Sequence, residues 1–145
     1  MDEKTTRPIR YICVKLEPQS SKLLENVVLA KFGRSYSRIF CDHLTLAYGQ
    51  EQVDGFDSSL FGASVSFDTE GIAYDMNCVA ALVNREDVED IGCRRENPHV
   101  TMATNGRTPT VYSNKLAEMY RSGSELVGFI RFVNTLRGTV EPVYA

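Results

Sequence analysis

The sequence predicts one α+β domain over residues 1–145, and three observations carry that prediction. Short segments such as Tyr11–Leu16 alternate apolar and polar residues, as half-buried strands do. Asn77–Val83 is almost continuously apolar, which is typical of a strand covered on both faces. Two further segments place apolar residues at helical spacing. Several strands mixed with two main helices indicate an α+β or mixed α/β sandwich.

The first quarter of the chain contains an arm, a strand and a helix. Residues 1–8 are polar and are expected to form a loose arm. In the strand Tyr11–Leu16, every second side chain is apolar. A helix follows, with Ser20 or Ser21 as its N-terminal cap and Gly33 as its C-terminal stop.

The middle of the chain predicts three more strands. They cover Phe40–Tyr48, Ala63–Phe67 and Asn77–Val83, and the turn-rich stretch Asp54–Ser59 separates the first two. Arg85–Arg95 is polar and predicts a short helix or a loop.

The last third of the chain predicts a strand at His99–Thr104 and a helix over Ser113–Arg121 that Ser113 caps. Two final strands are expected at Leu126–Val133 and Thr139–Tyr144. A turn at Leu136–Gly138 would join them as partners.

Composition narrows the functional classes. Apolar residues make up 43% and charged residues 24%, so a globular domain is expected. The net charge of −3 argues against a protein that coats long nucleic acids, yet it allows a short nucleotide ligand. No signal peptide or membrane-spanning run is visible, which predicts a cytoplasmic protein. The four cysteines form no C-x-x-C pair, so neither a zinc site nor any other cofactor is expected.

Both histidines of the chain open the same pattern. The two segments are His43-Leu44-Thr45-Leu46 and His99-Val100-Thr101-Met102. Residues two apart in a strand point to the same face, so each histidine shares a face with its threonine while the apolar residues pack behind. A single such pair is usually structural, but two that use every histidine of the chain favour a catalytic function.

This pattern suits phosphodiester chemistry without a metal ion. One imidazole can take a proton from a nucleophile while the other gives a proton to the leaving oxygen. Each threonine hydroxyl can donate to a phosphate oxygen as charge builds up. The catalytic candidates are therefore His43, Thr45, His99 and Thr101.

With these two motifs, the chain resembles the 2H phosphoesterases. The resemblance implies a bilobal fold, in which two pseudo-symmetric, antiparallel-rich sheets form a central cleft and helices pack outside. It also implies metal-independent cleavage at ribose-linked phosphates.

Two groups within that family share further features with the segments Asn97–Thr104 and Tyr112–Leu116. One is the cyclic phosphodiesterase domain of fungal-type tRNA ligases, and the other is the anti-CBASS nucleases of phages. The short, acidic chain favours the second group. That resemblance implies cleavage of 3′–5′ bonds in cyclic di- or oligonucleotide messengers by the ribose 2′-hydroxyl, which serves viral evasion of bacterial immunity in the host cytoplasm.

Two alternatives stay open at this point: a 2′,3′-cyclic phosphodiesterase that processes RNA ends, and a nucleotide-binding module without turnover. Tyr11 and Lys15 lie on the non-core face of their strand and could bind substrate, although an exposed edge would look the same. The resemblance to the anti-CBASS group adds Glu141 as a third substrate-binding candidate.

Overall fold

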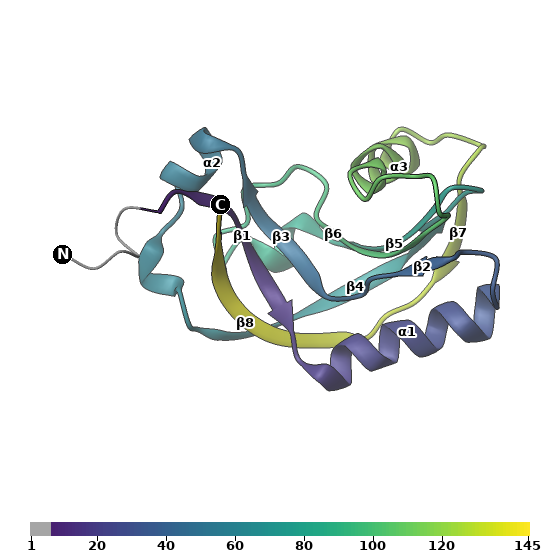
Figure 1. Ribbon diagram of the computed structural model, residues 1–145, viewed down its shortest axis with the longest axis horizontal. Coiled ribbons are helices and arrows are strands. Elements are labelled where there is room, and N and C mark those ends of the chain that lie inside the picture. Colours follow the sequence, from purple (N-terminus) through teal and green to yellow (C-terminus); the bar gives the residue numbers. More distant parts are fainter. Residues whose placement is uncertain (1–6) are drawn as a thin grey trace.

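The computed structural model describes residues 7–145, which form one curved sheet and three α-helices (Figure 1). Short 3-10 turns occur at Ser58–Leu60 and Arg85–Val88. In chain order the strands and α-helices are β1 (Ile9–Leu16), α1 (Pro18–Phe32), β2 (Arg38–Ile39), β3 (His43–Tyr48), α2 (Gln50–Asp54), β4 (Ser64–Tyr74), β5 (Cys78–Val83), β6 (His99–Thr104), α3 (Tyr112–Arg121), β7 (Gly128–Arg131) and β8 (Thr135–Tyr144).

All strand pairs in the sheet are antiparallel, and the α+β class is confirmed. The strand order is β2-β6-β3-β1-β8-β4-β5, with β7 beside β4. Strand β6 also pairs with β5, so the hydrogen bonds run in a closed circuit through β6, β3, β1, β8, β4 and β5. The expected architecture had two pseudo-symmetric sheets. The structure has one continuous sheet instead, and the bilobal symmetry is not confirmed.

Strand β5 shows how the two faces of the sheet are used. Its six residues are all buried, as the apolar run predicted. Val79, Ala81 and Val83 join the main core, which α1 completes with Leu24 and Val28. The alternate residues of β5 form a second, smaller cluster with α3: Cys78, Ala80 and Leu82 against Leu116 and Ala117. Helices α1 and α3 therefore pack on opposite faces of the sheet (Figure 1).

The expected strand Phe40–Tyr48 is interrupted. Cys41 has a φ of 53°, a conformation that few residues other than glycine adopt, and regular pairing resumes only at His43. The backbone N–H groups of Phe40 and Cys41 donate to successive carbonyls of β6, at 2.9 and 3.0 Å. This kink ends β2 and turns the chain into β3. The alternation of apolar residues gives no signal for it.

The expected turn at Leu136–Gly138 is wrong, because these residues lie inside β8. Strand β7 pairs with β4, whereas β8 crosses between β1 and β4. Gly138 is required for this close approach: a Cβ there would lie 2.3 Å from the Lys15 carbonyl oxygen. The glycine that indicated a turn therefore marks backbone packing between strands.

The serine caps expected for the two helices are also wrong. Helix α1 begins at Pro18, and Ser20 instead accepts a hydrogen bond from the Arg137 N–H at 2.9 Å. Ser113 is the second residue of α3, and its hydroxyl does not cap the helix. Of the expected arm, residues 1–6 lie outside the described part. Pro8 accepts a hydrogen bond from the Ala145 N–H, at 3.0 Å.

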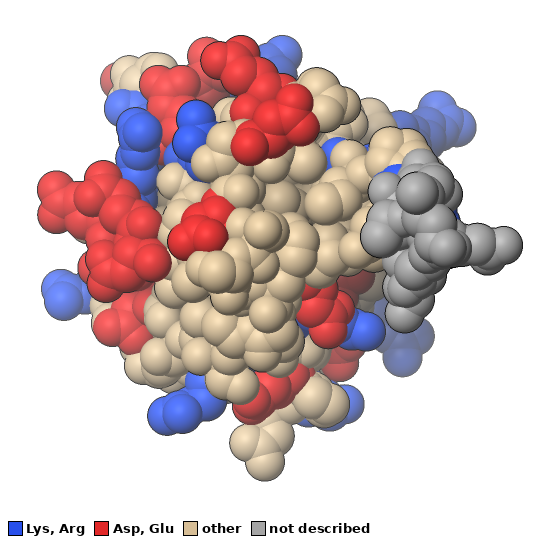
Figure 2. All heavy atoms as spheres, turned by 90° about the vertical axis from the view of Figure 1, so that its left-hand side faces the viewer, with Lys and Arg blue, Asp and Glu red and all other residues tan. Residues whose placement is uncertain are grey.

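Charged groups are mixed on the face shown in Figure 2, where acidic and basic side chains surround a largely uncharged centre. This face therefore offers no broad basic surface of the kind that long nucleic acids require. Within residues 7–145, no helix is long and apolar enough to cross a membrane.

Candidate functional site

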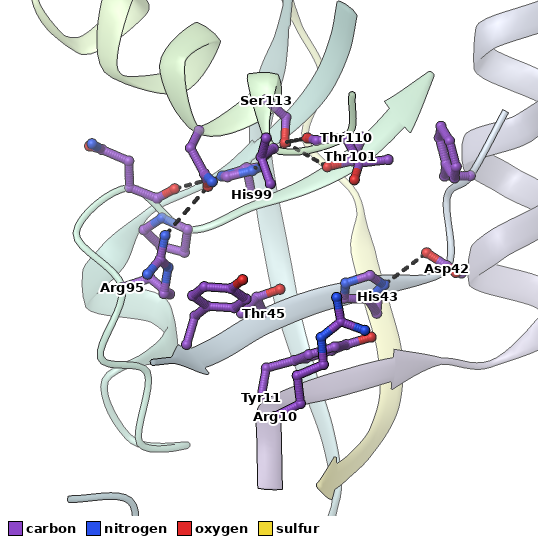
Figure 3. A pocket seen from close by; sticks show the side chains of 16 residues that line it. Arg10, Tyr11, Asp42, His43, Thr45, Arg95, His99, Thr101, Thr110 and Ser113 are labelled. Carbon is purple, nitrogen blue, oxygen red and sulfur yellow. Dashed lines mark hydrogen bonds and ion pairs between the residues drawn. The ribbon is translucent and has the colours of Figure 1, made fainter. Parts of the chain in front are cut away.

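A pocket of about 280 Å³ lies over strands β3 and β6, beside the start of α3 (Figure 3). All four motif residues, His43, Thr45, His99 and Thr101, line it. Both halves of the sequence pattern therefore meet in one cavity. The structure brings together residues that the chain separates by more than fifty positions.

The two motifs face one another because β3 pairs with β6. Leu44 lies opposite Val100 in an antiparallel register, and both side chains are fully buried. The residues on either side of this pair point to the other face of the sheet, toward the pocket. In this register each histidine lies level with the threonine of the other motif. The two motif strands therefore lie side by side in the sheet.

The His43 ring is held by its neighbour Asp42. The Nδ1 atom lies 2.9 Å from Asp42 Oδ1, and about a third of the His43 side chain is exposed. The hydrogen bond from His43 lowers the pKa of the Asp42 carboxyl below its usual value. An ionised carboxylate favours a proton on Nδ1, so Nε2 is the atom available to a ligand. The kink at Cys41 brings Asp42 to this position.

The His99 ring has neutral partners instead of a carboxylate. Its Nδ1 donates to the Asn97 carbonyl at 2.8 Å, and its Nε2 lies 2.9 Å from Ser113 Oγ. Burial lowers the pKa of His99 below its usual value, and the positive charges of Arg95 and His43 add to this effect, while the bond to Asn97 opposes it. His99 is therefore a neutral base near pH 7, with its lone pair on Nε2.

The two threonines also differ in their surroundings, because only one of them is hydrogen-bonded to another side chain of the described residues. Thr101 Oγ1 lies 2.7 Å from Ser113 Oγ, so its hydroxyl is held by the protein (Figure 3). The Thr45 hydroxyl, which is half-buried, has no hydrogen-bond partner within residues 7–145. A ligand in the pocket can therefore use Thr45 without breaking a bond of the protein.

The three substrate-binding candidates are placed unequally. Tyr11 lines the pocket, with its ring centroid 5.6 Å from that of His43. Lys15, on β1, lies opposite His43 of β3. Glu141, on β8, lies opposite Cys13 of β1, so both residues are near the site. Neither of these two lines the pocket. Alternation along a strand indicates the face of a residue, but it does not indicate how far the pocket extends.

Two arginines in the pocket wall were not singled out in the sequence. Arg10 precedes Tyr11, and strict alternation would point it away from the site. An irregularity between Ile9 and Tyr11 in the pairing of β1 with β8 breaks that alternation. Arg95 comes from the loop before β6 and lies over the Tyr48 ring, 5.9 Å from its centroid. The pocket thus combines two cations with two tyrosine rings.

Asp42 and Ser113 are two further polar lining residues that the sequence did not indicate as parts of the site. Asp42 had no signal, because a residue adjacent to a histidine normally faces the other side of a strand. Ser113 was interpreted as a helix cap. Its position fourteen residues after His99 carries no periodic information. Across the described chain, no group of three or more His, Cys, Asp or Glu side chains could hold a metal ion.

Comparison with known families gives one match. The model of the fungal tRNA ligase phosphodiesterase domain matches residues 34–143. This range includes both H-x-T motifs, Arg95 and Ser113, and it leaves out β1 with Arg10 and Tyr11. A search of curated proteins found no match.

Proposed function

The chain belongs to the fungal tRNA ligase phosphodiesterase domain family and is a phosphodiesterase, and from this premise we propose that it opens 2′,3′-cyclic phosphates on ribonucleotides or RNA ends. One observation carries the proposal. Two histidines face one pocket, and each has its Nδ1 occupied, so each presents Nε2 for proton transfer. This arrangement suits a reaction that needs one base and one acid.

The different surroundings of the rings support different roles. His99 is neutral and acts as the base: its Nε2 takes a proton from water, and the water oxygen attacks the phosphorus. His43, paired with the Asp42 carboxylate, acts as the acid. As the bond between phosphorus and one ribose oxygen breaks, His43 Nε2–H protonates that oxygen. The products are a phosphomonoester and a free ribose hydroxyl.

Charge on the phosphate is met by groups on opposite sides of the pocket. Thr45 donates a hydrogen bond to a nonbridging oxygen, and Arg10 and Arg95 provide positive charge. The Tyr11 ring, beside His43, is placed to stack on a base or ribose. A small, singly charged cyclic phosphate fits this lining without a metal ion.

Cyclic oligonucleotide messengers are the second candidate substrate. The sequence favoured them, and the pocket has two tyrosine rings, Tyr11 and Tyr48, with centroids 6.5 Å apart. Such a pair of rings, with Arg10 and Arg95 nearby, suits a ligand that carries more than one base. In that reaction His99 would activate the ribose 2′-hydroxyl instead of a water molecule.

A substrate panel tests the proposal. The protein is incubated with 2′,3′-cyclic AMP, an RNA with a 2′,3′-cyclic end, 3′,3′-cyclic GMP–AMP and linear RNA, each with and without EDTA. We expect the two 2′,3′-cyclic substrates to be opened at equal rates with and without the chelator. Turnover of cyclic GMP–AMP alone would overturn the proposal in favour of the second candidate and a role in viral evasion. Loss of activity with EDTA would overturn the metal-free mechanism.

The acid side of the pH profile is a direct consequence of the His99 environment. Because burial lowers the pKa of His99, the ring stays neutral as the pH falls below 6.5, the ordinary value. A base that must be neutral therefore keeps working in mildly acidic solution. We expect kcat/KM for 2′,3′-cyclic AMP to fall only below pH 6.5 on the acid side. A half-maximal point clearly above pH 6.5 would contradict the role of His99 as the base.

A further inference from the structure

Ser113 is bonded to more groups than one hydroxyl can satisfy as a donor. Its Oγ lies 2.9 Å from His99 Nε2, 2.7 Å from Thr101 Oγ1 and 2.8 Å from the Thr110 carbonyl oxygen. A hydroxyl has one proton to donate and can accept two hydrogen bonds. Ser113 is only 2% exposed, so bulk water does not complete this set. The single hydroxyl proton of Ser113 can therefore be donated to only one of these three groups at a time.

While His99 is neutral, the serine proton is held away from Thr101. Asn97 offers a carbonyl, which only accepts, so Nδ1 carries the ring proton and Nε2 is bare. The serine proton then has two partners that can only accept, Nε2 at 2.9 Å and the Thr110 carbonyl at 2.8 Å, and Ser113 donates to one of them. Thr101 in turn donates its own proton to Ser113 Oγ. In this state the Thr101 hydroxyl has no proton to offer a ligand.

The direction of the Ser113 hydroxyl proton can change when His99 becomes charged. Nε2–H now donates to Ser113, which releases the serine proton. That proton can turn to the Thr110 carbonyl or to Thr101 Oγ1. In the second arrangement Thr101 accepts from Ser113 and is free to donate to a phosphate oxygen. With a neutral ring this second arrangement leaves both Nε2 and the Thr110 carbonyl without a donor, whereas with a charged ring it leaves only the carbonyl, so protonation of His99 favours donation from Thr101 to a ligand.

We propose that Ser113 is a positioning residue that couples proton uptake by His99 to the turning of the Thr101 hydroxyl toward the phosphate. The inference rests on the proposed function for its timing: His99 takes a proton as negative charge forms on the phosphate oxygens. Thr101 then becomes a donor at the step where a donor is needed.

Other charged groups near His99 are few. Arg95 from the preceding loop and His43 from β3 act on it electrostatically, and both make the ring harder to protonate. Helix α3 presents Ser113 to the ring and no charged side chain among the groups that affect its pKa. The serine is therefore the polar contact of Nε2, and replacing it alters His99 without removing a charge.

The coupling is tested by following the two imidazoles by NMR as the pH changes. The chain has only two histidines, so His43→Asn assigns the His99 signals. In Ser113→Ala the charged ring loses an acceptor, and hydrogen bonds to charged groups are the stronger ones. We expect the His99 midpoint to move to lower pH by about half a unit, and kcat for 2′,3′-cyclic AMP to fall at least about tenfold with KM within about twofold.

Thr101→Val separates a coupled network from independent contacts. Donation from Thr101 strengthens the bond from Ser113 to neutral His99, so its loss raises the His99 midpoint. We expect a rise of a few tenths of a unit in the wild-type background and none in the Ser113→Ala background. Ser113→Thr should restore both the midpoint and kcat to near wild type. If the Ser113→Thr variant does not fold, Ser113→Cys is used in its place, because cysteine is closer in size to serine.

Ser20→Ala is the matched control, because Ser20 is a buried serine whose hydroxyl is bonded on the opposite side of the sheet. It should change neither imidazole signal. Equal shifts from Thr101→Val in both backgrounds, or an unchanged His99 midpoint in Ser113→Ala, would overturn the coupling. The NMR arms need no substrate. A chain that fails to open cyclic phosphates therefore disproves the proposed function while the His99 shifts still decide the role of Ser113.

Discussion

Replacing either histidine of the pocket is expected to lower kcat/KM for 2′,3′-cyclic AMP by about 10³-fold, within the range known for general acid–base groups. His99→Ala removes the group that takes the proton, and His43→Ala removes the group that returns it. Because both transfers belong to one displacement, the double variant should lose at most about tenfold more than either single variant. The measurement is the initial rate of ring opening, with purified single and double variants.

Asparagine provides the sharper replacement at both positions. In His99→Asn the side-chain amide can still donate to the Asn97 carbonyl, as Nδ1 does now at 2.8 Å, while Nε2 is gone. The same holds for His43→Asn and Asp42. Loss of activity with an unchanged melting temperature then reports on proton transfer and not on folding. Activity within tenfold of wild type in either asparagine variant would remove that histidine from the mechanism.

The sequence was sufficient wherever a residue's neighbours along the strand decide its environment. Apolar alternation placed His43 and Thr45 on one face of β3, and the pairing of Leu44 with Val100 confirms that face. The continuous run in β5 predicted burial on both sides, because every second residue meets a different cluster. These predictions depend only on the period of two in a strand.

Features that depend on distant contacts were not predictable from the same pattern. The kink at Cys41 exists because two consecutive N–H groups bond to β6, which is sixty residues later. Gly138 was interpreted as a turn residue. A glycine is required there because the backbone of Lys15 on β1 lies close to it, and that contact is distant in the sequence. Ser113 looked like a cap because the sequence does not show that α3 starts above His99.

The asymmetry of the site is another consequence of these distant contacts. Two tetrapeptides with the same His-apolar-Thr-apolar pattern pair with one another, yet one histidine has a carboxylate partner and the other has a backbone carbonyl and a serine. The carboxylate reaches its ring because of the kink at Cys41, and the serine reaches its ring because of the position of α3. The motifs predict a pair of proton-transfer groups, and only the surrounding fold distinguishes the two roles.

Removing the Thr45 hydroxyl is expected to lower kcat by about 10²-fold, the usual loss when one donor to a developing oxyanion is removed. Thr45 has no partner within residues 7–145, so its proton is available to a nonbridging oxygen at every stage of the reaction. Thr45→Val keeps the shape and removes the donor, whereas Thr45→Ser keeps the donor and should stay within about tenfold of wild type.

The division of the Thr45 effect between kcat and KM tests its physical cause. Negative charge on the phosphate oxygens grows between the bound cyclic phosphate and the pentacoordinate state, so a donor helps the second more than the first. Steady-state kinetics of Thr45→Val with 2′,3′-cyclic AMP should therefore show the loss in kcat, with KM changed by no more than about threefold. A raised KM with normal kcat would mean that Thr45 holds the substrate and takes no part in stabilising the transition state.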